Sequence, residues 1–147
     1  MLKDGFTSPA DLVHEINNLI ESQKYEDAYK LVLGHLPDSR FQSSDVYYVC
    51  SRLCLSIADT HSRSNREQYE FYINSGYRFA KTGYSLDENH PGCAKYLAIL
   101  LEKQLWIKGK RKWIEASITL REHLLKSLSL EPTDSLVCIK WDYGVLK

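Results

Sequence analysis

The sequence predicts an all-α protein in which about seven helices form antiparallel pairs that stack side by side. Apolar residues recur at helical spacing along nearly the whole chain, and no stretch shows the alternation that is typical of a strand. Acidic or proline-containing junctions separate the helical stretches, and the junctions at residues 86–101 and 130–136 resemble each other 44 positions apart. Within the first of these, Pro91 suits the first position of a helix, and an apolar face follows it at Ala94, Leu97, Ala98 and Leu101.

Two short helices are expected at the N-terminal end. The first begins at Pro9 with Ser8 as its cap, and the second begins at Tyr25 after the polar turn 22–24 and ends near residues 34–37. Because so short a turn joins them, the two helices should lie antiparallel to each other.

The third and fourth helices are expected at about residues 44–58 and 66–85, with a polar loop between them. Ser64 and Glu67 form a capping-box pattern at the start of the fourth helix. That helix contains Gly76 and Gly83, each of which costs about 1 kcal/mol relative to alanine. Since the two glycines lie seven residues apart on one face, we expect a neighbouring helix to approach closely there.

The fifth helix is expected to run from Pro91 to about Trp106, and the sixth from Trp113 to the junction at Pro132. Residues 108–112 should interrupt them as a basic loop, and a seventh helix should begin near Asp134. We therefore predict one helical-repeat domain over residues 1–147, with units at about 9–40, 44–89 and 90–133 and a partial unit at 134–147.

Composition excludes several classes of protein. Hydrophobic residues make up 44% of the chain and charged residues 26%, which is typical of a folded protein rather than a disordered one. The 19 basic and 19 acidic side chains cancel, so no overall field attracts nucleic acid. We expect a cytoplasmic protein, because there is neither a signal peptide nor an apolar run of the roughly 20 residues that a membrane span needs.

The chemistry-bearing residues do not form a catalytic or metal-binding motif. The four cysteines, which make no C-x-x-C pair, are interpreted as buried thiols in a reducing compartment: Cys50, Cys54, Cys93 and Cys138. The five histidines are scattered, and no glycine-rich phosphate loop is present. The sequence therefore predicts a protein that is not an enzyme and needs no cofactor or metal.

The pattern resembles the tetratricopeptide repeat, which pairs two helices over 34 residues. Positions that fit it include Tyr25 and Ala28 in the first unit, the small residues Gly76, Ala80 and Gly83 in the second, and Leu97, Ala98 and Leu101 in the third. The 44-residue spacing of the two junctions leaves about ten residues beyond the standard period. We expect them between the two helices of the third unit, around residues 108–115.

This longer form resembles one family in particular, the regulators of microtubule dynamics. The resemblance is carried by residues 90–101, 110–118, 121–132 and 140–141. It implies a microtubule-associated protein with a role at the spindle and in chromosome segregation. Some members of that family carry a membrane anchor, and one tethers membranes and binds phospholipid, but we expect no anchor here and do not carry membrane localisation over to this chain.

Two candidate binding surfaces follow. The first is the basic cluster Lys108, Lys110, Arg111 and Lys112, which is either a solvated loop or a contact for an acidic surface such as that of tubulin. Trp106 and Trp113 flank it and are interpreted as packing anchors. The second is the concave groove of the stacked pairs, for which we expect a lining of Val13, Asn17, Tyr47, Lys95, Ile99, Glu102 and Ile139.

The function expected from these features is a non-enzymatic scaffold at the cytoskeleton or spindle. Its basic cluster would bind microtubules or tubulin, and its groove would accept a protein or peptide. The alternative is a phospholipid-binding module, in which the groove holds an acyl chain and basic residues meet the phosphate. A deep apolar tunnel would favour the lipid, whereas a shallow mixed surface would favour a peptide or filament.

Overall fold

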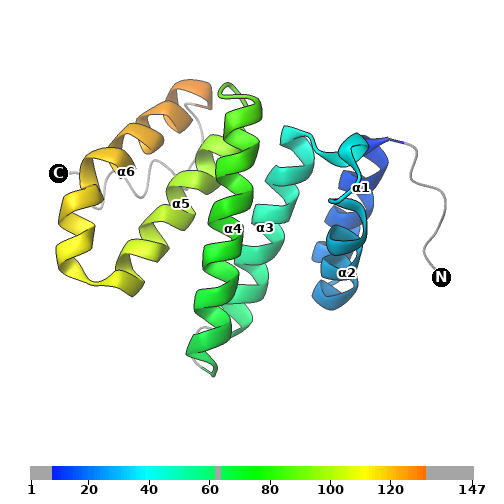
Figure 1. Cartoon of the computed structure of the whole chain (residues 1–147), viewed down its shortest axis with the longest axis horizontal. Coiled ribbons are helices and arrows are strands. Elements are labelled where there is room, and N and C mark those ends of the chain that lie inside the picture. The colour runs from blue at the N-terminus through cyan, green and yellow to red at the C-terminus, as the bar shows by residue number, and fades with distance from the viewer. Residues whose placement is uncertain (1–7, 62–63, 132–147) are drawn as a thin grey trace.

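The computed structural model of the protein describes residues 8–61 and 64–131. Within these ranges the chain forms six α-helices, one short 3-10 helix and no strand (Figure 1). They are α1 (Pro9–Glu21), α2 (Tyr25–His35), η1 (Ser39–Phe41), α3 (Ser44–His61), α4 (Arg66–Leu86), α5 (Pro91–Lys108) and α6 (Lys110–Leu130). The all-α prediction is confirmed. The segment of the expected seventh helix, together with the partial unit 134–147, lies outside the described residues.

Local sequence signals explain where α1 and α5 begin. The hydroxyl of Ser8 accepts the N–H of Asp11 at 3.4 Å, and Pro9 follows at the first helical position. At α5, Nδ1 of His90 accepts the N–H of Cys93 at 3.1 Å. Both caps satisfy a backbone donor that the first helical turn leaves without an intrahelical partner.

The cap of α4 differs from the expected one by a single residue. The side-chain oxygen of Asn65, rather than that of Ser64, accepts the N–H of Gln68 at 3.1 Å. Asparagine and serine are comparably good caps, so the sequence pattern alone did not separate the two positions.

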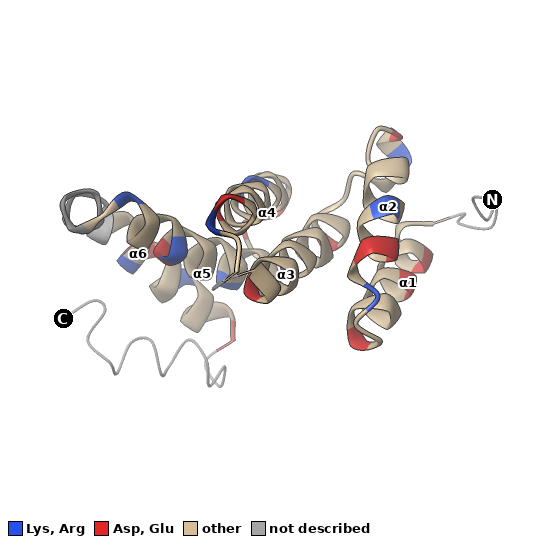
Figure 2. Cartoon of the chain, turned by 90° about the horizontal axis from the view of Figure 1, so that it is seen from below, with Lys and Arg blue, Asp and Glu red and all other residues tan. Residues whose placement is uncertain are grey.

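Consecutive helices form three antiparallel pairs, α1–α2, α3–α4 and α5–α6, which follow one another along the molecule (Figure 1). In the turned view, α4 lies above α3 (Figure 2). Helix α5 is the most deeply placed, with ten buried residues against three in α1. The core is therefore denser around α5 than around the first helix of the first pair.

Three clusters of buried residues make up the core, and they share helices α3 and α5. The first joins α1, α2, η1 and α3, and includes Leu12, Ile16, Val32, Phe41 and Leu53. The second joins α3, α4 and α5 through Ala58, Ile73, Ala80, Leu97 and Leu100. The third joins α5 and α6 through Ala98, Leu101, Leu105, Leu120 and Leu124. Each pair thus buries its apolar faces against the next pair, as in other helical arrays.

The two glycines of α4 mark close helix contacts, as expected from the sequence. A Cβ atom on Gly76 would lie 3.0 Å from the Cβ atom of Cys54 on α3. A Cβ atom on Gly83 would lie 2.7 Å from the sulfur of Cys93 on α5 and 3.0 Å from the Cβ atom of Tyr47 on α3. The low helix propensity of glycine is therefore offset by the packing of α4 against both neighbours.

The expected basic loop at residues 108–112 is wrong. Helix α5 continues to Lys108, α6 begins at Lys110, and Gly109 with φ +95° is the single residue between them. Lysine and arginine favour helices, and glycine supplies the one left-handed conformation that the sharp turn needs. The additional residues of this unit therefore lengthen its helices, to 18 residues in α5 and 21 in α6, instead of forming a loop.

Three of the four cysteines are buried free thiols, as the sequence predicted: Cys50, Cys54 and Cys93. Cys138 lies outside the described residues.

Candidate functional site

The third helix pair carries an excess of positive charge. Residues 91–130 include eight lysines or arginines and three glutamates, and basic segments recur along α5 and α6 (Figure 2). Lys108 is exposed at the end of α5. The backbone of Lys110, Arg111 and Lys112 forms the first turn of α6, whereas their side chains lie outside the described residues. The basic cluster thus stands at a corner between two helices.

The first helix pair has the opposite character. Residues 9–35 include five carboxylates and two lysines, and acidic segments mark both α1 and α2 (Figure 2). A chain without net charge is therefore acidic at one end of the stack and basic at the other. Because the middle pair separates the two ends, each can act on a partner locally.

Large apolar side chains are exposed on both helices of the third pair. Trp106 on α5 is 64% exposed, and Ile118 on α6 is 70% exposed. Most of the Trp106 surface is not covered, although we expected this residue to anchor the packing of the turn. Tryptophan is enriched in protein interfaces and among the residues that contribute most to binding energy.

The predicted groove residues do not share one open face. Ile99 is only 2% exposed and Glu102 only 9%, so both lie inside the molecule. The ring of Tyr47 lies 6.2 Å from that of Phe79 on α4, which places it between the two helices of its own pair. For Ile99 and Glu102 the expected place on an open face is wrong, because both side chains pack inside the molecule, whereas Tyr47 is half-buried and its place in a groove stays a prediction.

The other groove residues are placed as follows. Val13 is half-buried against the first core cluster, and the side-chain oxygen of Asn17 accepts a hydrogen bond from Arg52 at 2.7 Å. The ammonium group of Lys95 lies 5.8 Å from the centre of the Tyr96 ring. Ile139 lies outside the described residues. A groove with this lining stays a prediction.

A cleft of about 640 Å³ lies between the first and second helix pairs. It is lined by the turn after α1, the first two turns of α2, the end of α3 and Tyr72 of α4. This volume is within the roughly 300–1,000 Å³ of pockets that bind small ligands. The cleft is a candidate binding site that the sequence did not indicate.

Aromatic rings form much of the cleft wall. The rings of Tyr29 and Tyr72 meet edge to face, with centroids 5.5 Å apart and an interplanar angle of 80°. The ring of His61 lies nearly parallel to that of Tyr72, at 6.3 Å and 11°. Tyr25 also lines the cleft. Tyr25 and Tyr29 are spaced i, i+4 on α2, but Tyr72 is 43 residues further along the chain, so only the fold brings the three together.

Four charged side chains line the cleft together with these rings. Glu26 and Asp27 lie in the first turn of α2, and Lys24 and Lys30 also line it. The pKa of Tyr72 is raised above its usual value, chiefly by burial and also by the nearby Glu26 carboxylate.

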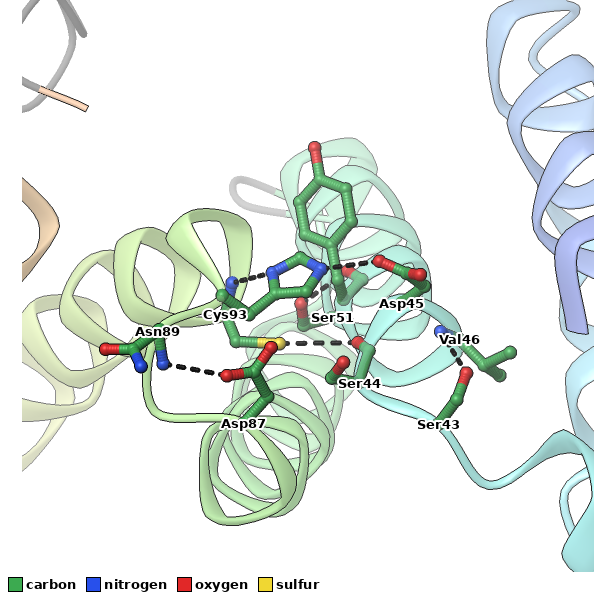
Figure 3. A network of polar contacts seen from close by, with 10 residues as sticks. Ser43, Ser44, Asp45, Val46, Ser51, Asp87, Asn89 and Cys93 are labelled. Carbon is green, nitrogen blue, oxygen red and sulfur yellow. Dashed lines mark hydrogen bonds and ion pairs between the residues drawn. The ribbon is translucent and has the colours of Figure 1, made fainter. Parts of the chain in front are cut away.

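A polar network holds the second and third helix pairs together. Nε2 of His90 lies 2.6 Å from Oδ1 of Asp45, and since Nδ1 accepts from the backbone, Nε2 is the donor to the carboxylate. The thiol of Cys93 donates to the carbonyl of Ser44 at 3.3 Å, and Ser43 caps the N–H of Val46 (Figure 3). These contacts join the adjacent N-terminal ends of α3 and α5, so the network is structural.

The thiols within the described residues are poor nucleophiles. Burial raises the pKa of Cys54 to about 12, and burial together with Asp45 and Asp87 raises that of Cys93 to about 12. A thiol with so high a pKa is not ionised near neutral pH and does not attack an electrophile.

Two other features are absent from the part of the chain that the structure describes. No three or more His, Cys, Asp or Glu side chains are grouped so that they could hold a metal ion. No helix there is both long enough and apolar enough to cross a bilayer.

Comparison with protein families gives a match over nearly the whole chain. The model of the family described as regulator of microtubule dynamics protein 1-3 matches residues 12–146. The comparison with curated proteins found no match, and neither did the comparison with solved structures. The family match confirms the resemblance that residues 90–101 and 110–132 carry.

Proposed function

Because the chain belongs to the regulator of microtubule dynamics family, we propose that it is a helical scaffold that binds microtubules through its basic α5–α6 end. The family is one of microtubule regulators rather than of enzymes, and its match implies a role in microtubule dynamics. In the cell, this scaffold acts at the cytoskeleton and the spindle, where it contributes to chromosome segregation.

The observation that carries the proposal is the separation of charge along the stack. The outer face of tubulin is strongly acidic, and the third helix pair has an excess of five positive charges. Interactions of this kind raise the rate of encounter and depend on salt, because ions screen charges over about 8 Å at physiological ionic strength. The exposed Trp106 supplies apolar area beside the charges.

The test is co-sedimentation of the full chain with microtubules over a series of salt concentrations. The first variant replaces Lys108, Lys110, Arg111 and Lys112 with glutamine. We expect it to pellet with a lower affinity and a shallower dependence on salt than the unmodified chain. Its helicity, measured by circular dichroism, should be unchanged, since Lys108 is exposed and the other three form the first turn of α6.

The matched control replaces Lys24 and Lys30 of the acidic end with glutamine, which should leave the pelleting unchanged. Equal binding of the four-site variant and the unmodified chain would contradict the proposal, as would pelleting that does not respond to salt. Vesicles of anionic phospholipid serve as a further arm. If the chain binds them and not microtubules, a lipid function replaces the one proposed.

A further inference from the structure

The cleft at the acidic end of the stack suggests a second binding function that does not depend on microtubule binding. We propose that it holds a lysine or arginine side chain of an extended peptide from a partner protein. The three features that carry this proposal are the paired tyrosine rings, the carboxylates of the first turn of α2, and the size of the cleft.

The rings favour a cation. The face of a tyrosine ring is electron-rich and attracts an ammonium or guanidinium group within about 6 Å. Tyr29 and Tyr72 both line the cleft, where their rings meet edge to face with centroids 5.5 Å apart. Together with Tyr25 on the same helix as Tyr29, three tyrosine rings line the cleft, and aromatic side chains of this kind also line the sites that bind alkylammonium groups.

The charge on the cleft wall agrees with this preference. Glu26 and Asp27 lie next to each other in the first turn of α2 and line the same cleft as Tyr72. Lys24 and Lys30 balance these two charges locally, but the first helix pair as a whole has three more carboxylates than lysines. The field across this end of the stack is therefore negative, and it complements a basic peptide.

The size of the cleft favours a peptide over a free amine. A volume of about 640 Å³ exceeds the space that one lysine side chain fills. The remaining space runs from the turn at Gln23, along the first two turns of α2, toward Thr60 at the end of α3. An extended segment can place one basic side chain against the rings and lay its backbone along α2.

The test is an NMR titration of the ¹⁵N-labelled full chain with three matched peptides. They are acetyl-Gly-Ser-X-Ser-Gly-amide with arginine, norleucine or glutamate at X. We expect the arginine peptide to cause saturable shifts at Glu26, Tyr29 and Tyr72, and the other two to cause none at the same concentrations. Norleucine keeps the aliphatic chain without the charge, so it separates a cation site from an apolar one.

Variants of the chain locate the site. Glu26→Gln should weaken binding of the arginine peptide about two- to fivefold, as expected for one contact to a partly exposed cation. The matched control is Glu67→Gln, in the first turn of α4, an exposed residue that does not line the cleft. Tyr72→Leu should abolish binding. If Tyr72→Leu also unfolds the chain, Glu26→Gln still tests the proposal, because Glu26 is exposed.

The lysines provide the sharpest distinction from an anion site. Replacing Lys24 and Lys30 with glutamine should strengthen binding of the arginine peptide, whereas a site for an anion would lose affinity. Four results would overturn the proposal: equal binding of the norleucine peptide, preference for the glutamate peptide, binding that ignores the Glu26 and lysine substitutions, or no saturable shift up to millimolar peptide. Binding of phosphatidylcholine vesicles without binding of the arginine peptide would likewise overturn it in favour of a lipid headgroup.

Discussion

The first and third helix pairs share one architecture and differ in length, burial and charge. Helices α1 and α2 have 13 and 11 residues, whereas α5 and α6 have 18 and 21. The first pair contributes few buried residues and carries carboxylates, while α5 is buried along its length and the pair is basic. The comparison shows that pairs with one architecture can differ in how much core they bury and in the charge that they present.

The largest expected difference between the two pairs is the loss of stability when a buried side chain of α5 is truncated. Leu100→Ala in α5 removes a fully buried side chain that joins α3, α4 and α5, and should lower the free energy of unfolding by about 3–4 kcal/mol. Ile20→Ala, at the end of α1 where the side chain is 6% exposed, should cost about 2 kcal/mol. Urea denaturation measures both. An equal or larger loss for Ile20→Ala would show that the first pair is as important to the core as α5.

The same substitution should have opposite signs in two regions of the stack. Gly83→Ala places a methyl group 2.7 Å from the sulfur of Cys93, and should destabilise the fold by about 1–3 kcal/mol. Gly34→Ala, in an exposed part of α2, should stabilise it by up to about 1 kcal/mol through helix propensity. Thermal unfolding followed by circular dichroism tests this. A stabilising Gly83→Ala would refute the close approach of α4 and α5.

Loss of a helix cap should matter more in the third pair than in the first. His90→Ala removes both the cap of α5 and the bond to Asp45, and should cost about 1–2 kcal/mol. Ser8→Ala removes only an exposed, 3.4 Å cap of α1, and should cost about 0.5 kcal/mol. Urea midpoints compared at one pH give the two values. A larger loss of stability for Ser8→Ala would show that the His90–Asp45 network contributes little to holding the second and third pairs together.

The smallest expected effect is a pH dependence of the stability of the fold, caused by His123 in the third pair. Burial lowers the pKa of His123, whose ring meets that of Tyr84 edge to face at 5.8 Å. The unfolded chain therefore takes up a proton at higher pH than the folded chain, and stability declines as the pH falls through about 6.5 and below. His123→Gln should flatten this decline when unfolding is measured between pH 7.5 and pH 5.0. An unchanged slope would assign the pH dependence to other groups.

The two candidate sites could be predicted from the sequence to different degrees. The basic corner is a run of neighbouring residues, so its place between the fifth and sixth helices was evident, although its conformation was not. The prediction of the groove lining depended on knowing which face of each helix points outward. An error of one residue rotates a helix face by about 100°, which is enough to bury Ile99 and Glu102.

The sequence by itself determined the helices and the contacts between neighbouring ones. Proline and cap residues locate the starts of α1 and α5, apolar spacing defines their faces, and Gly76 and Gly83 indicate where α4 is approached closely. All of these are local signals within one or two turns of chain. These signals depend on neighbouring residues and not on how the helices pack in the folded chain.

Only the tertiary structure decided which distant residues meet. The tyrosines of α2 and α4 form one cleft, and His90 reaches Asp45 from a position 45 residues away, because the pairs stack at particular angles and distances. Those angles result from the fit of many buried side chains at once. No short pattern of residues encodes them, which is why the aromatic cleft could be found only in the folded chain.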